Sequence, residues 1–347
     1  MSRVYLDWNA TTPLRVEAKV AMIEAMELVG NPSSVHAEGR AAKGLIERAR
    51  KDLAAALGAE GADIIFTSSA TEAAALALAG RGLSCAGIEH DAVRSWCVEE
   101  LEIDAQGAVS VPDPARSTLQ LANSETGVIQ SLPEGVVMTD ATQAFGKIPF
   151  AFNWCGADMA IVSAHKLGGP KGVGALIVKR GTDIEARIKG GGQEMGRRSG
   201  TENVIGIAGF AAAATAAQKD LETGTWSKVE KLRKILENTI AESANKTIFV
   251  GKVANRLPNT SCFVTPGWKG ETQVMVMDLA GFAVSAGSAC SSGKVKSSAA
   301  LAAMGFDQDH AGCALRVSLG PLTSETEVRA FAQAWLHEHE KFRARGR

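Results

Sequence analysis

The chain has 347 residues, of which 46% are hydrophobic and 22% charged, as in ordinary globular proteins. Its 37 basic and 38 acidic side chains give a formal net charge of −1, so the overall charge favours neither a nucleic-acid nor a membrane-surface partner. The N-terminus lacks the apolar core of a signal peptide, and the most apolar later stretch, residues 204–217, is too short to span a bilayer. This length predicts two domains, or one large domain with a smaller one folded onto it.

The six cysteines, at positions 85, 97, 155, 262, 290 and 313, are scattered along the chain and form no C-x-x-C pair. A disulfide framework belongs to short secreted chains, and a zinc site needs clustered ligands. We therefore expect reduced thiols, a cytoplasmic location and no metal site.

Strand-like and helix-like segments alternate, which predicts an α/β architecture with a largely parallel sheet. In chain order, we expect a helix over 16–29 that ends at Gly30, and a second with apolar spacing over 45–57 that ends at Gly58. Two helical stretches are expected from 206 to about 245, and the apolar run 204–217 is interpreted as a buried helix. A change of domain is expected near 245–255. The last third mixes short strands (261–264 and 315–319) with helices. The strands expected before it are 63–67, 118–121, 136–139, 159–162 and 174–178.

The strongest local motif is SAHKLGGPKG, residues 163–172, directly after an apolar strand. A lysine that forms a Schiff base needs a rigid, partly desolvated position, so that its amine can be neutral; Lys166 has such a position. Ser163 and His165 could donate hydrogen bonds to a phosphate, and the glycines allow close backbone approach. A basic, glycine-rich surface loop would have the same sequence, so the motif alone does not decide.

Two further motifs are each ambiguous. Asp140 ends an apolar strand, where it could pair with a protonated pyridine nitrogen or cap a helix. Residues 68–72, SSATE, could bind phosphate at a helix N-terminus through Thr71, or form a capping box. A phosphate-type turn, then a strand-end aspartate, then a strand-end lysine is the order found in fold-type I enzymes that use pyridoxal 5′-phosphate (PLP).

The chain resembles the cysteine desulfurases of the aminotransferase class V family nearly end to end. The matching segments are YLDWNATT at 5–12, NPSSVH at 31–36, SATE at 69–72, EH at 89–90, NSETG at 123–127, DATQ at 140–143, SAHK at 163–166, RSGT at 198–201, SAC at 288–290 and LRVSLG at 315–320. The resemblance implies a fold-type I PLP-transferase with a large PLP-binding domain over 13–250, built on a mostly parallel seven-stranded sheet. Residues 1–12 and 251–347 would form the smaller α+β domain, which carries the Cys290 segment and Arg316.

The resemblance also implies roles for individual residues. Lys166 would attach the cofactor, and His90 would stack on its ring and shuttle protons. Substrate carboxylate binding would fall to Arg316, by a bidentate pair, and to Asn123, with Asn31 a weaker candidate. At the cofactor ring, Asp140 would face the nitrogen and Gln143 the phenolic oxygen, with Asn123 beside them. The phosphate would be bound by Thr71, Ser163 and His165. Thr201 would reach the phosphate of the neighbouring subunit, which implies a homodimer.

Cys290 lies in SAGSACSSG, residues 285–293, whose small side chains suit a mobile loop better than a packed core. A thiolate there would attack the sulfur of L-cysteine, form a persulfide and release alanine. The other five cysteines are expected to be buried and inert.

Three other functions remain to be weighed against this one. A selenocysteine lyase or another class V aminotransferase would share the cofactor site, although an aminotransferase has no need of Cys290. A non-catalytic scaffold would have no need of Lys166, Asp140 or Arg316. Neither glycine-rich fingerprint of a P-loop or Rossmann nucleotide enzyme is present. The sulfur acceptor is expected to be a partner protein, such as an iron–sulfur scaffold.

Overall fold

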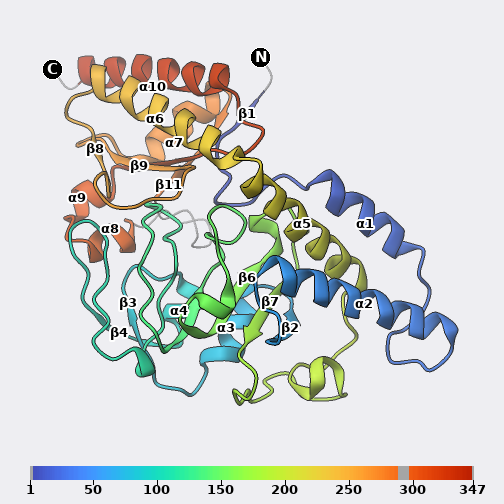
Figure 1. The fold of residues 1–347 in the computed structure, drawn as a ribbon. Helices are drawn as coiled ribbons and strands as arrows, with labels where there is room; N and C mark the ends of the chain where they lie inside the picture. Colours follow the sequence, from blue (N-terminus) through green and yellow to red (C-terminus); the bar gives the residue numbers. More distant parts are fainter. Residues whose placement is uncertain (1–2, 288–296, 346–347) are drawn as a thin grey trace.

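The computed structural model describes residues 3–287 and 297–345, and these form an α/β fold, as predicted. Cys290 lies outside the described residues. Figure 1 shows a larger part with a sheet at its centre and a smaller part that carries both chain ends, joined along the helices α5 and α6. The helices are α1 (Val16–Met26), α2 (Ala37–Ala56), α3 (Ala70–Leu78), α4 (Asp91–Arg94), α5 (Val204–Glu222), α6 (Thr225–Ser243), α7 (Gly270–Leu279), α8 (Ala299–Ala303), α9 (Gln308–Ala311) and α10 (Glu325–Arg345).

The central sheet is a row of seven extended segments. Four are the strands β2 (Asp63–Thr67), β7 (Gly174–Val178), β6 (Ala157–Ser163) and β5 (Val136–Asp140), in that order. Residues 117–121 follow, joined by single bridges to β5 and to β3 (Ser84–Ala86), and β4 (Val98–Leu101) completes the row. Only the two pairings of β7 are antiparallel, so the sheet is mostly parallel, as expected.

Side chains of the central strands alternate between two cores, because successive residues of a strand point to opposite faces. In β6, Ala160 and Val162 enter the core covered by α2 and α5, whereas Met159 and Ile161 enter the core under α3. Helices thus cover both faces, and a sheet of this kind leaves its strand ends open for a site.

The smaller part contains the antiparallel sheet β11 (Ser285–Ala286), β12 (Ala314–Ser318), β9 (Thr260–Val264) and β8 (Ile248–Phe249), with β1 (Val4–Tyr5) paired to β10 (Phe282–Ala283) beside it. Its core includes Trp226, Leu236 and Ile240 of α6, packed with side chains of α10. The domain division at residue 250 stays a prediction, but the packing of α6 favours a boundary between α5 and α6.

Two helices differ from their expected limits. The first ends at Met26, not Val29, and Gly30 is not its cap: a Cβ there would lie 1.9 Å from the carbonyl oxygen of Glu38, so only glycine allows the two segments to approach. The second begins at Ala37, eight residues before its expected start, because His36 caps its N-terminus by accepting from the backbone N–H of Gly39.

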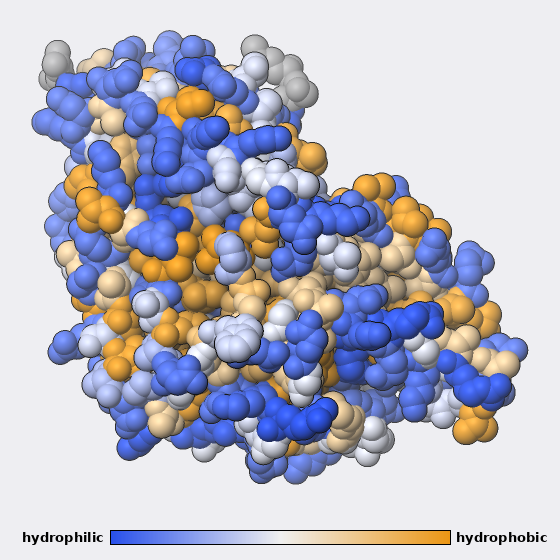
Figure 2. Space-filling model, in the orientation of Figure 1, coloured by the Kyte–Doolittle hydropathy of each residue, from blue (hydrophilic) through white to orange (hydrophobic). Residues whose placement is uncertain are grey.

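One face of α1 is apolar yet exposed. Val16, Val20 and Ile23 recur at helical spacing and are 69%, 49% and 50% exposed, and Figure 2 shows hydrophobic surface over this helix. Such a contiguous patch is typical of a protein–protein contact. No helix among the described residues combines the length and the apolar character needed to cross a membrane.

Candidate active site

The candidate residues converge on one edge of the central sheet. Because β2, β3, β5, β6 and residues 117–121 run in the same direction, their carboxyl ends meet there. The residues that follow these ends are Thr71 after β2, His90 after β3, Asn123 after 117–121, Asp140 and Gln143 at β5, and Ser163, His165 and Lys166 at β6. The strand order therefore brings these eight predicted residues to one edge, whereas Arg316 comes from β12 of the smaller part.

Lys166 is partly buried in a short 3₁₀ turn directly after β6. Its Nζ donates to the backbone oxygens of Asn9 and Ala10, at 2.6 and 2.9 Å. The side chain of Gln143 contacts the same backbone oxygen of Asn9, to which its Nε2 donates at 2.9 Å. The N-terminal segment thus holds the amine of Lys166 and the amide of Gln143 side by side.

Asp140 and Glu89 are the acidic groups of this edge. Asp140 Oδ1 accepts from the backbone N–H of Thr142 at 2.8 Å in a turn, and no helix begins there, so the alternative interpretation of Asp140 as a helix cap is wrong. Glu89 is buried, with Oε1 on the backbone N–H of Gln120 at 2.5 Å and Oε2 without a partner among the described residues. Burial, and then the nearby charge of Asp140, raise the pKa of Glu89 well above its usual value.

The start of α3 has the character of an anion site. Ser69 caps the helix through the N–H of Glu72, and among described residues no acceptor is recorded for the N–H groups of Ala70 and Thr71. A Cβ at Gly174, which pairs with both Thr67 and Ser163, would lie 2.9 Å from the nitrogen of Ala70. Only glycine therefore allows β7 to pass so close to the helix start.

His165, which follows β6 at the same edge of the sheet, is an uncharged hydrogen-bond donor. Burial, and then the charges of Lys166, Lys171 and Lys147, lower its pKa to about 4, so the ring is uncharged at neutral pH. Its Nδ1 lies 3.2 Å from the hydroxyl of Thr11. A neutral imidazole can still donate one hydrogen bond to a phosphate oxygen.

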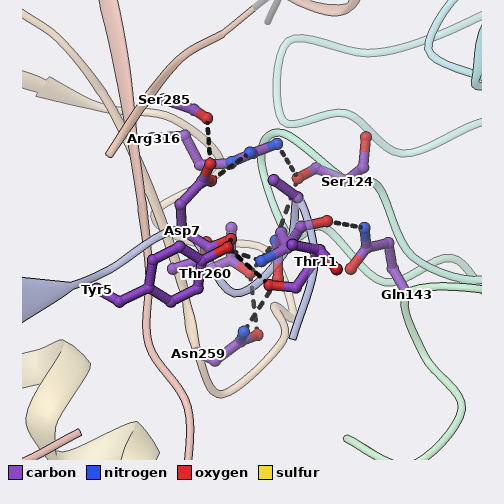
Figure 3. A network of polar contacts seen from close by, with 12 residues as sticks. Tyr5, Asp7, Thr11, Ser124, Gln143, Asn259, Thr260, Ser285 and Arg316 are labelled. Carbon is purple, nitrogen blue, oxygen red and sulfur yellow. Dashed lines mark hydrogen bonds and ion pairs between the residues drawn. The ribbon is translucent and has the colours of Figure 1, made fainter. Parts of the chain in front are cut away.

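Arg316 is buried and already paired. Its Nη2 donates to Asp7 Oδ1 at 2.7 Å and its Nη1 to the backbone oxygen of Ser124 at 3.2 Å, while Ser285 donates to the other oxygen of Asp7 at 2.9 Å (Figure 3). The side chain of Arg316 is 3% exposed, and its Nε has no partner in the described part of the chain. A buried donor of this kind is the group that a substrate carboxylate would satisfy.

Asn123 has mainly a structural part in this structure. Its side-chain oxygen accepts from the N–H groups of Glu125 and Thr126 and from the Thr126 hydroxyl, and its amide nitrogen donates to the oxygen of Ile88 at 2.9 Å. The amide ties the loop after residue 121 to the segment that carries His90. One N–H of the Asn123 amide remains for a ligand, so Asn123 could donate a single hydrogen bond to a substrate or cofactor.

Thr201 and Asn31 lie outside the Lys166 network. Thr201 is exposed and lines a hollow of about 160 Å³ with Thr67 and Ser68 near the start of α3. The side chain of Asn31 accepts from the backbone N–H of Ser33 in its own turn, at 2.9 Å. Their expected roles stay predictions, and Asn31 has no contact that supports one.

Five cysteines are described, and all are reduced. Cys85, Cys262 and Cys313 are buried, as expected, and burial raises the pKa of Cys262 to about 12. The expectation of burial is wrong for Cys97 and Cys155, which are half-buried. Cys290, the expected nucleophile, is outside the described residues.

A hollow of about 460 Å³ opens beside this edge and is lined by His90, Asn123 and Glu125, among others. Glu125 accepts from the hydroxyl of Ser298 at 2.5 Å. Burial raises the pKa of Glu125 to about 7, although the hydrogen bond from Ser298 and the charge of Arg316 oppose the shift.

The raised pKa of Glu125 has a measurable effect on stability. A carboxyl with a higher pKa when folded stabilises the protein fully below its unfolded pKa of about 4.5 and loses that contribution as the pH rises through about 7. Glu125→Gln lacks this titrating group, so its unfolding free energy should not show this loss. Between pH 4.5 and pH 8, we expect the unfolding free energy of the variant to rise relative to that of the unmodified protein by up to about 3 kcal/mol. Urea unfolding across this range measures the difference. The exposed Glu60→Gln should show none, and parallel curves for Glu125→Gln would contradict the assignment.

Three residues of the site were not singled out from the sequence: Asp7, Glu125 and Lys147. Asp7 and Glu125 belong to segments that carry the family resemblance, but their partners are distant in the chain. Lys147 had a usable signal, since it is a lone charge between Phe145 and Ile148 in an otherwise apolar run.

Known proteins resemble this chain over most of its length. The chain matches the Aminotransferase class-V family over residues 4–106 and 112–331. It is 37% identical to a cysteine desulfurase of Cereibacter sphaeroides, covering 94% of this chain and 93% of that protein. Among solved structures, a NifS-like protein from Rickettsia africae ESF-5 superposes with a TM-score of 0.88 at 30% identity, covering 97% and 99% of the two chains. SspA in complex with cysteine superposes with a TM-score of 0.74 at 26% identity, covering 92% and 100%.

Proposed function

The chain belongs to the aminotransferase class-V family, and we propose that it is a PLP-dependent cysteine desulfurase, which converts L-cysteine to L-alanine and passes the sulfur to Cys290. The observation that carries the proposal is the convergence of Lys166, Gln143, Asp140 and the α3 start on one sheet edge. Arg316 joins them from β12 with an Nε that has no partner among the described residues. A scaffold protein would have no need of this arrangement.

The residues present fit PLP. The α3 start, Ser163 and the neutral His165 offer donors to a phosphate, Asp140 offers a carboxylate to a ring nitrogen, and the Gln143 amide lies beside Lys166. When bound, PLP supplies an electron-withdrawing ring that makes the bonds of the substrate's α-carbon labile.

The chain's own residues then divide the work. Lys166 attaches the cofactor and, once released, moves the α-proton of the substrate. Arg316 holds the substrate carboxylate through Nε, with Asp7 fixing the guanidinium from the other side. The Cys290 thiolate attacks the substrate sulfur: an S–S bond forms, the C–S bond breaks, and its electron pair stays with the carbon skeleton, which is protonated to alanine.

The enzyme acts as a homodimer in this proposal. The exposed apolar face of α1, formed by Val16, Val20 and Ile23, supports a contact between two copies (Figure 2). Thr201 would then contribute to the phosphate site of the neighbouring subunit. The persulfide would be delivered to an acceptor protein, for which iron–sulfur cluster assembly is the proposed pathway.

The test is to purify the protein with PLP, add L-cysteine, and assay alanine and reducible sulfur. We expect equal amounts of both, and we expect Cys290→Ser to keep the cofactor absorbance while losing sulfur transfer by at least about a thousandfold, because the nucleophile is gone. Alanine formed from selenocysteine alone would favour a selenocysteine lyase. A cofactor band without sulfur release would favour an aminotransferase, and full activity of Cys290→Ser would refute the role of Cys290.

A further inference from the structure

Lys147 is a buried lysine in the turns that follow β5, and its hydrogen-bond partners among the described residues are two neutral amides. It is 2% exposed, and its Nζ donates to Gln143 Oε1 at 2.5 Å and to Asn9 Oδ1 at 3.1 Å. No carboxylate forms an ion pair with it in residues 3–287 and 297–345. Burying an amine of this kind costs free energy that an apolar side chain would not, so its position calls for a functional explanation.

The contact with Gln143 determines which way its amide faces. An ammonium only donates, so the amide oxygen must face Lys147, and the amide nitrogen must face the other way. There Nε2 donates to the backbone oxygen of Asn9 at 2.9 Å. Without Lys147, one end of the Gln143 amide would lose its partner and its orientation would be less well defined.

The contact with Asn9 connects the two lysines. The side-chain oxygen of Asn9 accepts from Lys147 and from Asn259, and its backbone oxygen accepts from Lys166 at 2.6 Å. Both lysines also line one cavity of about 480 Å³, together with Trp8. Lys147 therefore acts on Lys166 through a single residue.

The charges of this region bear on Lys166 as well. Burial, and then the charges of Lys166 and Arg316, lower the pKa of Lys147 well below its usual value. The repulsion is mutual, so the two amines compete for protons. Of the other charged groups nearby, Arg316 pairs with Asp7 and Arg15 pairs with Asp220. The exposed Glu17 also lines the cavity.

We propose that Lys147 is a positioning residue of the reaction site: it orients the Gln143 amide and Asn9, and so sets how tightly PLP is held and the pH at which Lys166 can attach it. The inference rests on the proposed use of PLP. It goes beyond it because Lys147 acts through Gln143 and Asn9, to which its Nζ donates.

The experiment compares Lys147→Met, which has similar length and no N–H, with Lys147→Gln, which keeps a donor and has no charge. The exposed Lys179→Met is the matched control. Two readouts are used besides activity: the dissociation constant of PLP from the apoprotein, and the pH midpoint of covalent attachment, measured by borohydride trapping.

For Lys147→Met, we expect the PLP dissociation constant to rise about tenfold and the attachment midpoint to move by about one pH unit, because the Gln143 amide and Asn9, which meet the amine of Lys166 at the Asn9 backbone oxygen, lose the donor that orients them. Lys147→Gln, a shorter donor, should recover most of the PLP affinity and only part of the midpoint. Both variants should fold, since an apolar or neutral side chain is easier to bury.

If PLP affinity and midpoint of both variants equal those of Lys179→Met, the proposal for Lys147 is wrong while the proposed function stands. If the unmodified protein itself neither binds PLP nor is trapped by borohydride, the proposed function is what has failed. If Lys147→Met does not fold, the proposal is tested by Lys147→Gln alone, through its pH midpoint of PLP attachment.

Discussion

Lys166→Ala is expected to lower cysteine desulfurase activity by at least about ten-thousandfold, because it removes both the covalent attachment of PLP and the base that moves the α-proton. The amine follows the end of β6 and is held by the backbone oxygens of Asn9 and Ala10. Activity is measured as alanine released from L-cysteine.

Trapping shows whether the loss has this cause. Borohydride reduction of the unmodified protein with PLP, followed by peptide mass analysis, should place the label on Lys166. The exposed Lys171, in the same loop, is the matched control, and Lys171→Ala should keep the label and most of the activity. A label on Lys171 or Lys147 would contradict the assignment of Lys166.

Arg316→Gln is expected to have two separate effects. It removes the buried donor proposed for the substrate carboxylate, which should lower kcat/KM for L-cysteine about a hundredfold or more, mainly through KM. It also leaves Asp7 without its cation, which should lower the unfolding free energy by about 3 kcal/mol, because breaking one side of a buried ion pair leaves an uncompensated charge.

A double variant separates the two effects. In Asp7→Asn with Arg316→Gln, no buried charge remains, so urea unfolding should recover much of the lost stability. The kcat/KM should stay low, since the carboxylate donor is still missing. If kcat/KM recovers together with stability, Arg316 acts only through folding and does not bind substrate.

The sequence predicted the parts of the fold that depend on local pattern. The strand 174–178 was found to the residue, because a continuous apolar run lies between Gly174 and the basic residues after Val178. The strand-end positions of Lys166 and Asp140 followed from the same signal. Residues 118–121 lie at the expected place, but this segment is joined to the sheet by one bridge on each side, Ser117 to β3 and Thr118 to β5.

The contacts that complete the site could not be predicted, because they join distant residues of unlike character. Nothing near Asp7 or Arg316 in the chain indicates that they pair. The sequence predicted that the Asn123 amide binds a ligand. Its side-chain oxygen instead accepts from the N–H groups of Glu125 and Thr126, two and three residues further along the chain, in a local turn. Local hydrogen bonds of this type compete with ligand binding and have no periodic signature.

The first residues of the chain make their key contacts with some of the last. Asp7 pairs with Arg316, and Asn9 with Asn259 and Ser318, across 250 to 309 residues of sequence. During synthesis at roughly 5–20 residues per second, this segment is therefore without its partners for on the order of tens of seconds. Lys166 is made early but lacks its surroundings until β12 has left the ribosome. A nascent chain cannot complete the PLP site before synthesis is nearly finished, and premature termination between Lys166 and Arg316 yields a product that contains Lys166 but lacks Arg316.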